Sequence, residues 1–317
     1  MQFHLFITDP LETLNYELDT SLKIARSLRH LGHTIAFTTQ EALSLDNTGA
    51  KARVSLVKDW HSESLPQLEH GKTSMLSEFS AIHFRTDPPT DERYWSTTWI
   101  LDKVPPKTTV FNSPNALRSL NEKLLIFDFP EASAPALLSC DPLEISDFIQ
   151  KCCRDHVIAK PLTLFGGRGV EQYEFTNTKE QNSWIVKVTE NGKRAMIFQP
   201  FDKGIFQGEI RAFAFNGKCY TWCLKKPAKG QFLANTRAGA TLEPYRPTQE
   251  ITEKLNAIAQ ALTFKGVHFI GFDVIGENVS EINITSPRLL TANPNSQVII
   301  ELSKAIERFI REKHNTD

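Results

Sequence analysis

The chain has 317 residues, of which 40% are hydrophobic. This is long enough for a well-buried core and predicts about two domains. The 36 Lys and Arg residues nearly balance the 37 Asp and Glu residues, which gives a net charge of −1. A charge this close to zero creates no field that would hold the chain on nucleic acid or on an anionic membrane. We therefore expect small-molecule partners, with no nucleic acid and no membrane.

The N-terminal residues predict a β-strand and not a secretion signal. Their apolar run has no basic leader and is interrupted by Asp9 and Pro10. Later stretches fall short of the roughly 20 consecutive apolar residues that a membrane helix needs. We expect a cytoplasmic protein, in which the five cysteines are reduced thiols.

The first third of the chain alternates short apolar strands with amphipathic helices. Apolar residues recur at three-residue steps from Leu22 to Leu31, and Gly32 is placed to end that helix. A second helix is predicted over residues 92–101. This order predicts a parallel sheet with helices on its faces. The predicted strands are residues 3–7, 34–38, 81–85 and 108–111.

Beyond residue 121 the pattern changes to short strands with polar and glycine-rich connections, as in a small α+β lid. Asn216 and Gly217 predict a two-residue hairpin turn. Apolar residues at steps of three and four predict a helix from Ile251 to Leu262 and a closing helix from Ile299 to Phe309. The predicted strands in this part are residues 157–160, 184–187, 196–199, 209–215, 219–225, 267–275 and 279–284.

The most specific pattern for a functional site is the segment GFDVIGENVSEIN, residues 271–283. If residues 276–278 form a three-residue hairpin loop, Asp273 lies opposite Glu281 and Asn283 follows on the same face. Carboxylates directly opposed across two strands repel one another. A divalent cation removes that repulsion, and oxygen ligands of this kind suit Mg²⁺ held jointly with phosphates. The alternative is an exposed polar hairpin that binds no metal.

A second pattern, KPLTLFGGRGV over residues 160–170, combines a lysine with three glycines. Lys160 ends an apolar strand, and Gly166, Gly167 and Gly169 follow it. Glycines allow a close approach of the backbone to a phosphate and orient N–H groups toward an anion. A tight turn without a ligand explains the same glycines.

The residues around Lys123 and Arg211 do not decide the role of either cation. Lys123 is typical of an exposed helix lysine. Arg211 lies in an apolar strand and needs an anionic partner there. That partner is either a structural carboxylate or a group that takes part in catalysis.

The order of the segments then becomes informative, because it resembles the order of motifs in bacterial glutathione synthetases, which are ATP-grasp ligases. The resemblance covers roughly residues 1 to 310, and its last segment is the most specific. The segments are FITDPLETLN (6–15), FRTDPPTDERY (84–94), SLNEKLL (119–125), IAKPLTLFGGRGV (158–170), FQPF (198–201), GEIRAF (208–213) and GFDVIGENVSEINITSP (271–287).

The resemblance implies an ATP-grasp fold, with α/β and α+β parts. An N-terminal parallel-sheet α/β domain, the pre-ATP-grasp domain, would span residues 1–120. The ATP-grasp domain would span residues 121–313. A small lid would occupy about residues 125–200 of it, and a C-terminal ATP-binding part would occupy about residues 201–313.

The resemblance also implies a role for each candidate residue. Lys123 and Lys160 would bind the phosphates of ATP, next to the loop that carries Gly166, Gly167 and Gly169. Arg211 would lie near the transferred phosphoryl group. The backbone that would contact adenine comprises Phe198, Gln199, Pro200 and Phe201. The ligands of Mg²⁺, or of Mn²⁺ in its place, would be Asp273, Glu281 and Asn283.

The activity that the resemblance implies is ATP-dependent ligation of γ-glutamylcysteine and glycine through an acyl phosphate, by a homo-oligomer such as a tetramer. Two segments differ from the family pattern. Residues 225–244 carry Lys225, Lys226, Lys229 and Arg237 in place of a stretch richer in glycine and arginine. Residues 288–297 replace a segment that usually leads to an acidic residue. Two alternatives therefore stay open: a related ligase with a different donor or acceptor, and a nucleotide-binding regulatory protein that does not ligate.

Overall fold

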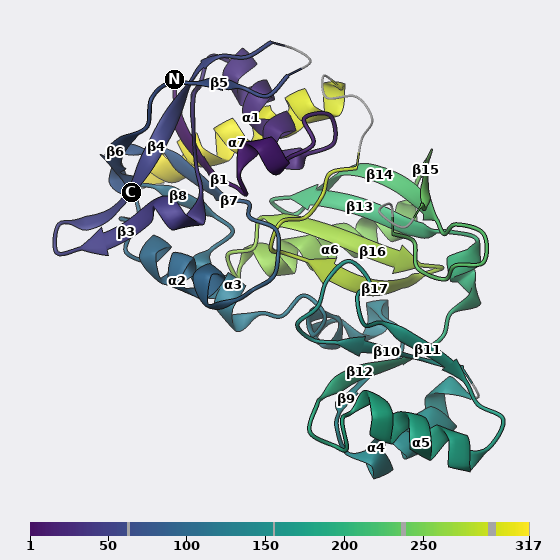
Figure 1. Ribbon diagram of the computed structural model, residues 1–317. Coiled ribbons are helices and arrows are strands. Elements are labelled where there is room, and N and C mark those ends of the chain that lie inside the picture. The colour runs from purple at the N-terminus through teal and green to yellow at the C-terminus, as the bar shows by residue number, and fades with distance from the viewer. Residues whose placement is uncertain (62–63, 155, 236–238, 291–295, 317) are drawn as a thin grey trace.

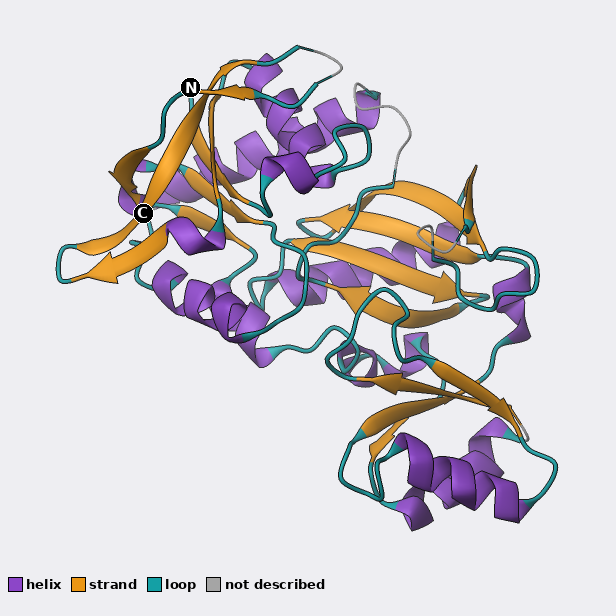
Figure 2. Cartoon of the chain, in the orientation of Figure 1, coloured by secondary structure: helices purple, strands orange, loops and turns teal. Residues whose placement is uncertain are grey.

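The computed structural model describes residues 1–61, 64–154, 156–235, 239–290 and 296–316. Over these residues the chain forms three sheets, one in the N-terminal region, one in a projecting lid and one in the C-terminal region. Figure 1 shows the lid at one end of the molecule, and Figure 2 shows helices packed against each of the sheets. Within the described residues, none of the helices is both long and apolar enough to span a bilayer.

The N-terminal sheet has the strand order β3-β4-β2-β1-β7-β8. Strands β2, β1, β7 and β8 run parallel, as the alternating pattern predicts. Four strands that were not predicted extend the sheet in antiparallel fashion through β4. The bounds are β1 Phe3–Ile7, β2 Thr34–Thr38, β3 Leu43–Asp46, β4 Gly49–Asp59, β5 Gln67–Leu68, β6 Lys72–Met75, β7 Ala81–Phe84 and β8 Thr109–Phe111.

The helices of this region begin where the sequence supplies a cap. The Asp19 side chain accepts a hydrogen bond from Leu22 N at the start of α1, and Gly32 follows the helix with a φ of 89°. The C-terminal helix α7 returns to lie beside α1 (Figure 1), so both chain ends build this region. The bounds are α1 Thr20–His30, α2 Glu92–Leu101, α3 Pro114–Ser119 and α7 Gln297–Thr316.

The lid is a four-stranded sheet, in the order β11-β10-β12-β9, with helices α4 and α5 against it. The prediction of a strand at residues 184–187 is wrong, because these residues lie in α5. Asn177 caps that helix by accepting from Glu180 N, and Trp184, Ile185 and Val188 share its buried face. The bounds are β9 Leu137–Ser139, α4 Pro142–Phe148, β10 His156–Pro161, β11 Glu171–Glu174, α5 Thr178–Val188 and β12 Met196–Pro200.

The C-terminal sheet is antiparallel throughout, in the order β15-β14-β13-β16-β17. Asn216 and Gly217 have φ values of 46° and 81° and form the predicted turn between β13 and β14. Helix α6 packs against these two strands. The bounds are β13 Glu209–Phe215, β14 Lys218–Lys226, β15 Thr241–Pro244, α6 Gln249–Thr263, β16 Phe269–Ile275 and β17 Asn278–Asn283.

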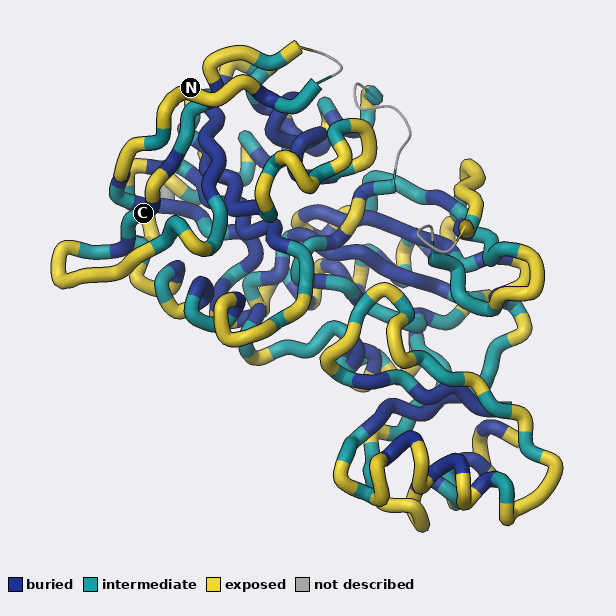
Figure 3. The backbone as a smooth tube through the Cα atoms, viewed as in Figure 1, coloured by how far each residue is buried: buried dark blue, intermediate teal, exposed yellow. Residues whose placement is uncertain are grey.

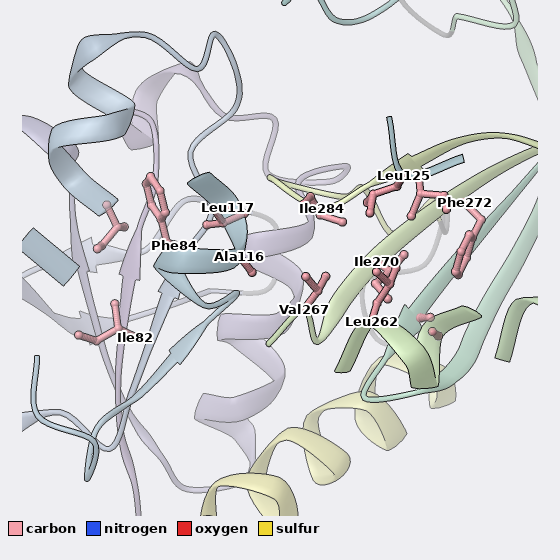
Figure 4. Close-up of a cluster of buried hydrophobic side chains, with 14 of the residues drawn as sticks. Ile82, Phe84, Ala116, Leu117, Leu125, Leu262, Val267, Ile270, Phe272 and Ile284 are labelled. Carbon is pink, nitrogen blue, oxygen red and sulfur yellow. The ribbon is translucent and has the colours of Figure 1, made fainter. Parts of the chain in front are cut away.

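The N-terminal region and the C-terminal sheet share a hydrophobic core, whereas the lid has its own. Figure 4 shows apolar side chains of both regions in one cluster, among them Phe84, Leu117, Val267 and Ile284. The buried Asn112 side chain adds hydrogen bonds to the backbone of β16 and to Ile284. In Figure 3 buried residues also occur within the lid, and these lid residues form a hydrophobic cluster of their own. The lid is therefore attached to a larger, continuously packed body.

Candidate active site

A cavity of about 520 Å³ lies where the lid, the C-terminal sheet and the edge of the N-terminal region meet. This volume suits a nucleotide together with part of a second substrate. Every candidate residue except Gly169 and Phe198 lines the cavity. Those that do are Lys123, Lys160, Gly166, Gly167, Gln199, Pro200, Phe201, Arg211, Asp273, Glu281 and Asn283.

The predicted pairing of carboxylates is present, but a different turn produces it. Asp273 lies opposite Glu281, and Asn283 lies opposite Gly271. The β16–β17 turn has two residues and not the three that we predicted. The pairing is restored by a register shift, because residues 273 and 274 pair with 281 and 279 and so leave one extra residue on β17. The two carboxylates and the amide therefore belong to one face of the sheet.

The cations of the neighbouring strands lie next to these carboxylates. Arg211 Nη1 donates to Asp273 Oδ2 at 2.9 Å, and Lys225 Nζ donates to Asp273 Oδ1 at 2.6 Å. Lys225 also forms an ion pair with Glu209. The strand register explains this cluster, because Arg211 is opposite Asp273 and Glu209 is opposite Lys225. Arg211 thus has a carboxylate partner and also lines the cavity, so both interpretations of it stay open.

These contacts fix the charge of Asp273. Burial opposes its ionisation, but Arg211 and Lys225 outweigh burial and lower the pKa of this carboxyl below its usual range. Burial also opposes the charged form of Lys225, yet Asp273 and Glu209 raise its pKa. Burial raises the pKa of Glu209, although Lys225 opposes that rise. Asp273 is therefore ionised at neutral pH, as a carboxylate that binds a metal must be.

Lys123 differs from the exposed helix lysine that its sequence suggested. It lies in a turn, is 9% exposed, and its Nζ donates to Leu164 O at 2.6 Å. The same Nζ is 3.5 Å from Glu281 Oε1. The preceding Glu122 accepts from the backbone and hydroxyl of Thr285, which ties this turn to the end of β17. Lys123 is thereby held next to the predicted metal ligands.

Lys160 enters the cavity from β10, and its Nζ donates to Ser280 O at 3.3 Å. Burial lowers the pKa of Lys160, while neighbouring carboxylates, first Glu281, oppose that effect. After the strand, Gly166 and Gly167 have φ values of 63° and 76°, which favour glycine. Gly169 also has a positive φ, but it lies against the side chains of Leu164 and Pro161 and does not line the cavity.

The four residues predicted to contact adenine divide into two groups. Phe198 is fully buried in the lid core, and β9 pairs with β12 as far as this residue. Gln199, Pro200 and Phe201 follow it and line the cavity. The Phe201 ring stacks on His156 with a centroid separation of 4.0 Å. The segment 199–201 is therefore available for the proposed adenine contacts.

Residues 225–244 are only partly a loop. Lys225 and Lys226 belong to β14, which extends one residue beyond the predicted end of that strand at residue 225. The connection that follows crosses the cavity, where Leu233 packs against Gly167 and Asn235 Nδ2 donates to Gly166 O at 2.6 Å. Lys229 is exposed, and Arg237 lies outside the described residues.

The residues present fit the ligands that the resemblance implies. Two lysines and two cavity-lining glycines with positive φ suit phosphates. Asp273, Glu281 and Asn283 form an all-oxygen set that suits Mg²⁺ with room for phosphate oxygens. Glu209, Lys225 and Arg288 also line the cavity and were not among the predicted site residues. Glu209 could have been found from its i, i+2 relation to Arg211, which places both side chains on one face of the strand.

This fold, with a cavity in which lysines lie beside paired carboxylates, is that of a ligase of the ATP-grasp class. The model for the prokaryotic glutathione synthetase N-terminal domain matches residues 2–118, and the model for the ATP-grasp domain of the same enzymes matches residues 122–297. The chain therefore belongs to the prokaryotic glutathione synthetase family, a family of ATP-dependent ligases.

Individual relatives agree with this assignment. The glutathione synthetase of Vibrio vulnificus strain YJ016 is 32% identical, with 96% of this chain and 97% of that protein covered. The glutathione synthetase of Synechocystis is 30% identical, with 89% of this chain and 91% of that protein covered. The crystal structure of the D-cycloserine synthetase DcsG shares the fold at a TM-score of 0.68 and 16% identity, covering 97% of this chain and 99% of that one.

Proposed function

We propose that this chain joins γ-glutamylcysteine to glycine in a reaction that consumes ATP. The observation that carries the proposal is the convergence in one cavity of Lys123, Lys160 and the facing pair Asp273 and Glu281. The full-length similarity to glutathione synthetases supports the choice of substrates.

In this proposal the cations position and neutralise the phosphates. Lys160 and Lys123 bind phosphate oxygens, and the backbone N–H groups of residues 166 and 167 add hydrogen bonds. Asp273, Glu281 and Asn283 hold Mg²⁺, with Mn²⁺ as a substitute. When bound, the metal offsets negative charge on the phosphates and so favours attack at the terminal phosphorus.

The reaction has two steps, because a carboxylate is a poor electrophile. The cysteinyl carboxylate of the dipeptide attacks the terminal phosphorus of ATP, and ADP leaves. The amine of glycine then attacks the acyl carbon, and phosphate leaves with one former carboxylate oxygen. Arg211, which lines the cavity, would stabilise negative charge that develops during both transfers. Positioning and electrostatic stabilisation account for most of the catalysis.

The lid has a protective role in this proposal, since water hydrolyses an acyl phosphate. Its separate core suits a body that moves as a unit over the cavity. The segment 232–235, which contacts the loop of Gly166 and Gly167, would close the remaining side of the cavity.

We also propose that the enzyme is cytoplasmic and forms a homo-oligomer, such as a tetramer. Light scattering by the purified protein tests the proposed assembly.

The test is ADP release from the purified protein with γ-glutamylcysteine and a panel of amino acids, with product masses determined in parallel. Release that depends on both γ-glutamylcysteine and glycine, together with the tripeptide mass, supports the proposal. Release with another donor or acceptor supports a related carboxylate-amine ligase. Nucleotide binding without release under any combination supports a regulatory protein.

A further inference from the structure

The end of the cavity next to the N-terminal region carries both signs of charge. It is lined by Asp87 and Pro88 from the loop after β7 and by Thr285, Arg288 and Leu290 from the segment after β17. Arg288 Nη2 donates to Asp87 Oδ2 at 2.9 Å. This contact engages one of the five N–H donors that a guanidinium carries.

The backbone that carries Arg288 is held firmly on both sides. Arg85, which is 4% exposed, donates through Nη2 to Pro287 O at 2.7 Å. The N–H of Leu289 donates to the hydroxyl of Thr20 at 2.8 Å in a buried contact. A side chain on an anchored backbone loses less freedom when it binds a ligand, so Arg288 is placed to recognise one.

The segment also connects this end of the cavity to the reaction centre. Arg211 Nε donates to Arg288 O at 3.4 Å, and the same guanidinium pairs with Asp273. A donor whose reacting carboxylate lies at Arg211 would therefore place its other end within reach of the Arg288 side chain. Asp9 and Asp19 lie close to Asp87. Burial raises the pKa of each of these two carboxyl groups, and the negative charge of Asp87 raises it further.

From this geometry we infer that Arg288 and Asp87 recognise the zwitterionic amino-acid end of the donor. Arg288 binds the α-carboxylate and Asp87 binds the α-ammonium group, so that the ligand inserts into the existing ion pair. This inference rests on the proposed function, because it takes γ-glutamylcysteine as the donor. It assigns the specificity for the γ-glutamyl group to two side chains outside the phosphate and metal sites.

A purely structural role explains the ion pair of Arg288 and Asp87 less well than ligand recognition does. The Arg288 and Asp87 side chains are 45% and 37% exposed, and exposed ion pairs contribute little to stability. The variants Arg288→Ala and Asp87→Asn should therefore fold. Arg93→Ala is a matched control, because Arg93 forms an exposed ion pair with Glu41 and does not line the cavity.

The experiment measures KM for three donors, with ATP and glycine held constant. The first is γ-glutamylcysteine, the second is 4-aminobutanoyl-cysteine, which lacks the α-carboxylate, and the third is glutaryl-cysteine, which lacks the α-amino group. Arg288→Ala should raise KM for γ-glutamylcysteine about 10- to 100-fold, as expected for a lost charge-assisted hydrogen bond. It should leave KM for 4-aminobutanoyl-cysteine unchanged. Asp87→Asn should raise KM for γ-glutamylcysteine and leave that for glutaryl-cysteine unchanged.

The possible results separate this inference from the proposed function. If Arg288→Ala still prefers γ-glutamylcysteine over 4-aminobutanoyl-cysteine as strongly as the wild type and Arg93→Ala do, the subsite is wrong and the proposed function stands. If the wild type neither ligates γ-glutamylcysteine nor binds it by calorimetry with ATP present, both are wrong. Loss of discrimination in Arg288→Ala, with KM for ATP unchanged, establishes the subsite.

Discussion

Lys225 Nζ lies 2.6 Å from Asp273 Oδ1, so the carboxylate proposed to bind the metal already contacts a cation. A divalent ion that takes this oxygen has to compete with the lysine. Lys225→Met should therefore tighten the binding of Mn²⁺ in the absence of nucleotide, as measured by electron paramagnetic resonance. Lys226→Met is the control, because Lys226 pairs with the exposed Glu243 on the neighbouring strand. Equal Mn²⁺ affinity in wild type and Lys225→Met would contradict this competition.

The proposed metal site leads to a prediction for Glu281, which lies opposite Asp273 across the hairpin. Glu281→Gln removes the charge with little change in volume, so kcat should fall about 100-fold while the melting temperature stays close to that of the wild type. Glu277→Gln is a suitable control, because this exposed glutamate lies in the turn of the same hairpin. Full turnover by Glu281→Gln at ordinary Mg²⁺ concentrations would remove this residue from the metal site.

The proposed phosphate site leads to a prediction for Lys160 and Lys123. Lys160→Met should weaken ATP binding more than Lys123→Arg, because methionine removes the charge and arginine keeps it with a different geometry. Isothermal titration calorimetry with ATP and Mg²⁺ measures both affinities. A Lys160→Met variant that binds ATP as tightly as the wild type would show that Lys160 has no phosphate role.

A buried histidine pair makes the folded state sensitive to acid. His4 Nδ1 and His83 Nε2 are 3.1 Å apart within the N-terminal sheet. Burial lowers the pKa of His4 to about 3 and that of His83 well below its ordinary value. Below pH 6.5 the unfolded chain therefore binds protons that the folded chain does not, so the free energy of unfolding falls as the pH falls.

The slope of this pH dependence gives the test. Each histidine that is neutral only in the folded state contributes about 1.4 kcal/mol per pH unit below its unfolded pKa. Urea unfolding between pH 7 and pH 5, where few carboxylates titrate, should show a shallower slope for His4→Phe than for the wild type. Identical slopes would show that His4 is protonated in the folded protein or already neutral in the unfolded one.

The spacing of apolar residues predicted most of the helices and strands. In those segments the residues that begin or end an element agree with the pattern of buried side chains. Helix α1 follows its apolar spacing and ends at Gly32, and the β13–β14 hairpin follows Asn216 and Gly217. The strand predicted at residues 184–187 failed because the tryptophan, isoleucine and valine there favour strands, whereas the cap at Asn177 begins a helix. Tertiary packing decided between these two signals.

The candidate site was predicted less completely, because the alignment of neighbouring strands brings its residues together, and the sequence alone does not give that alignment. Asp273 was paired with Glu281 from the sequence, although the turn has two residues and a register shift in place of three. The contact of Lys225 with Asp273 could not be found in this way, since it depends on how β14, β13 and β16 align. The burial of Lys123 could not be predicted either, because its bond to Leu164 O and its approach to Glu281 join residues far apart in the sequence.

The most direct test of the central claim follows one oxygen atom through the reaction. The protein is incubated with ATP, Mg²⁺, glycine and γ-glutamylcysteine whose cysteinyl carboxylate carries ¹⁸O, and the products are analysed by mass spectrometry. Two-step ligation predicts the tripeptide and inorganic phosphate that contains one ¹⁸O from the carboxylate. Unlabelled phosphate, or ATP consumption that does not depend on glycine and forms no tripeptide, would contradict the proposed reaction.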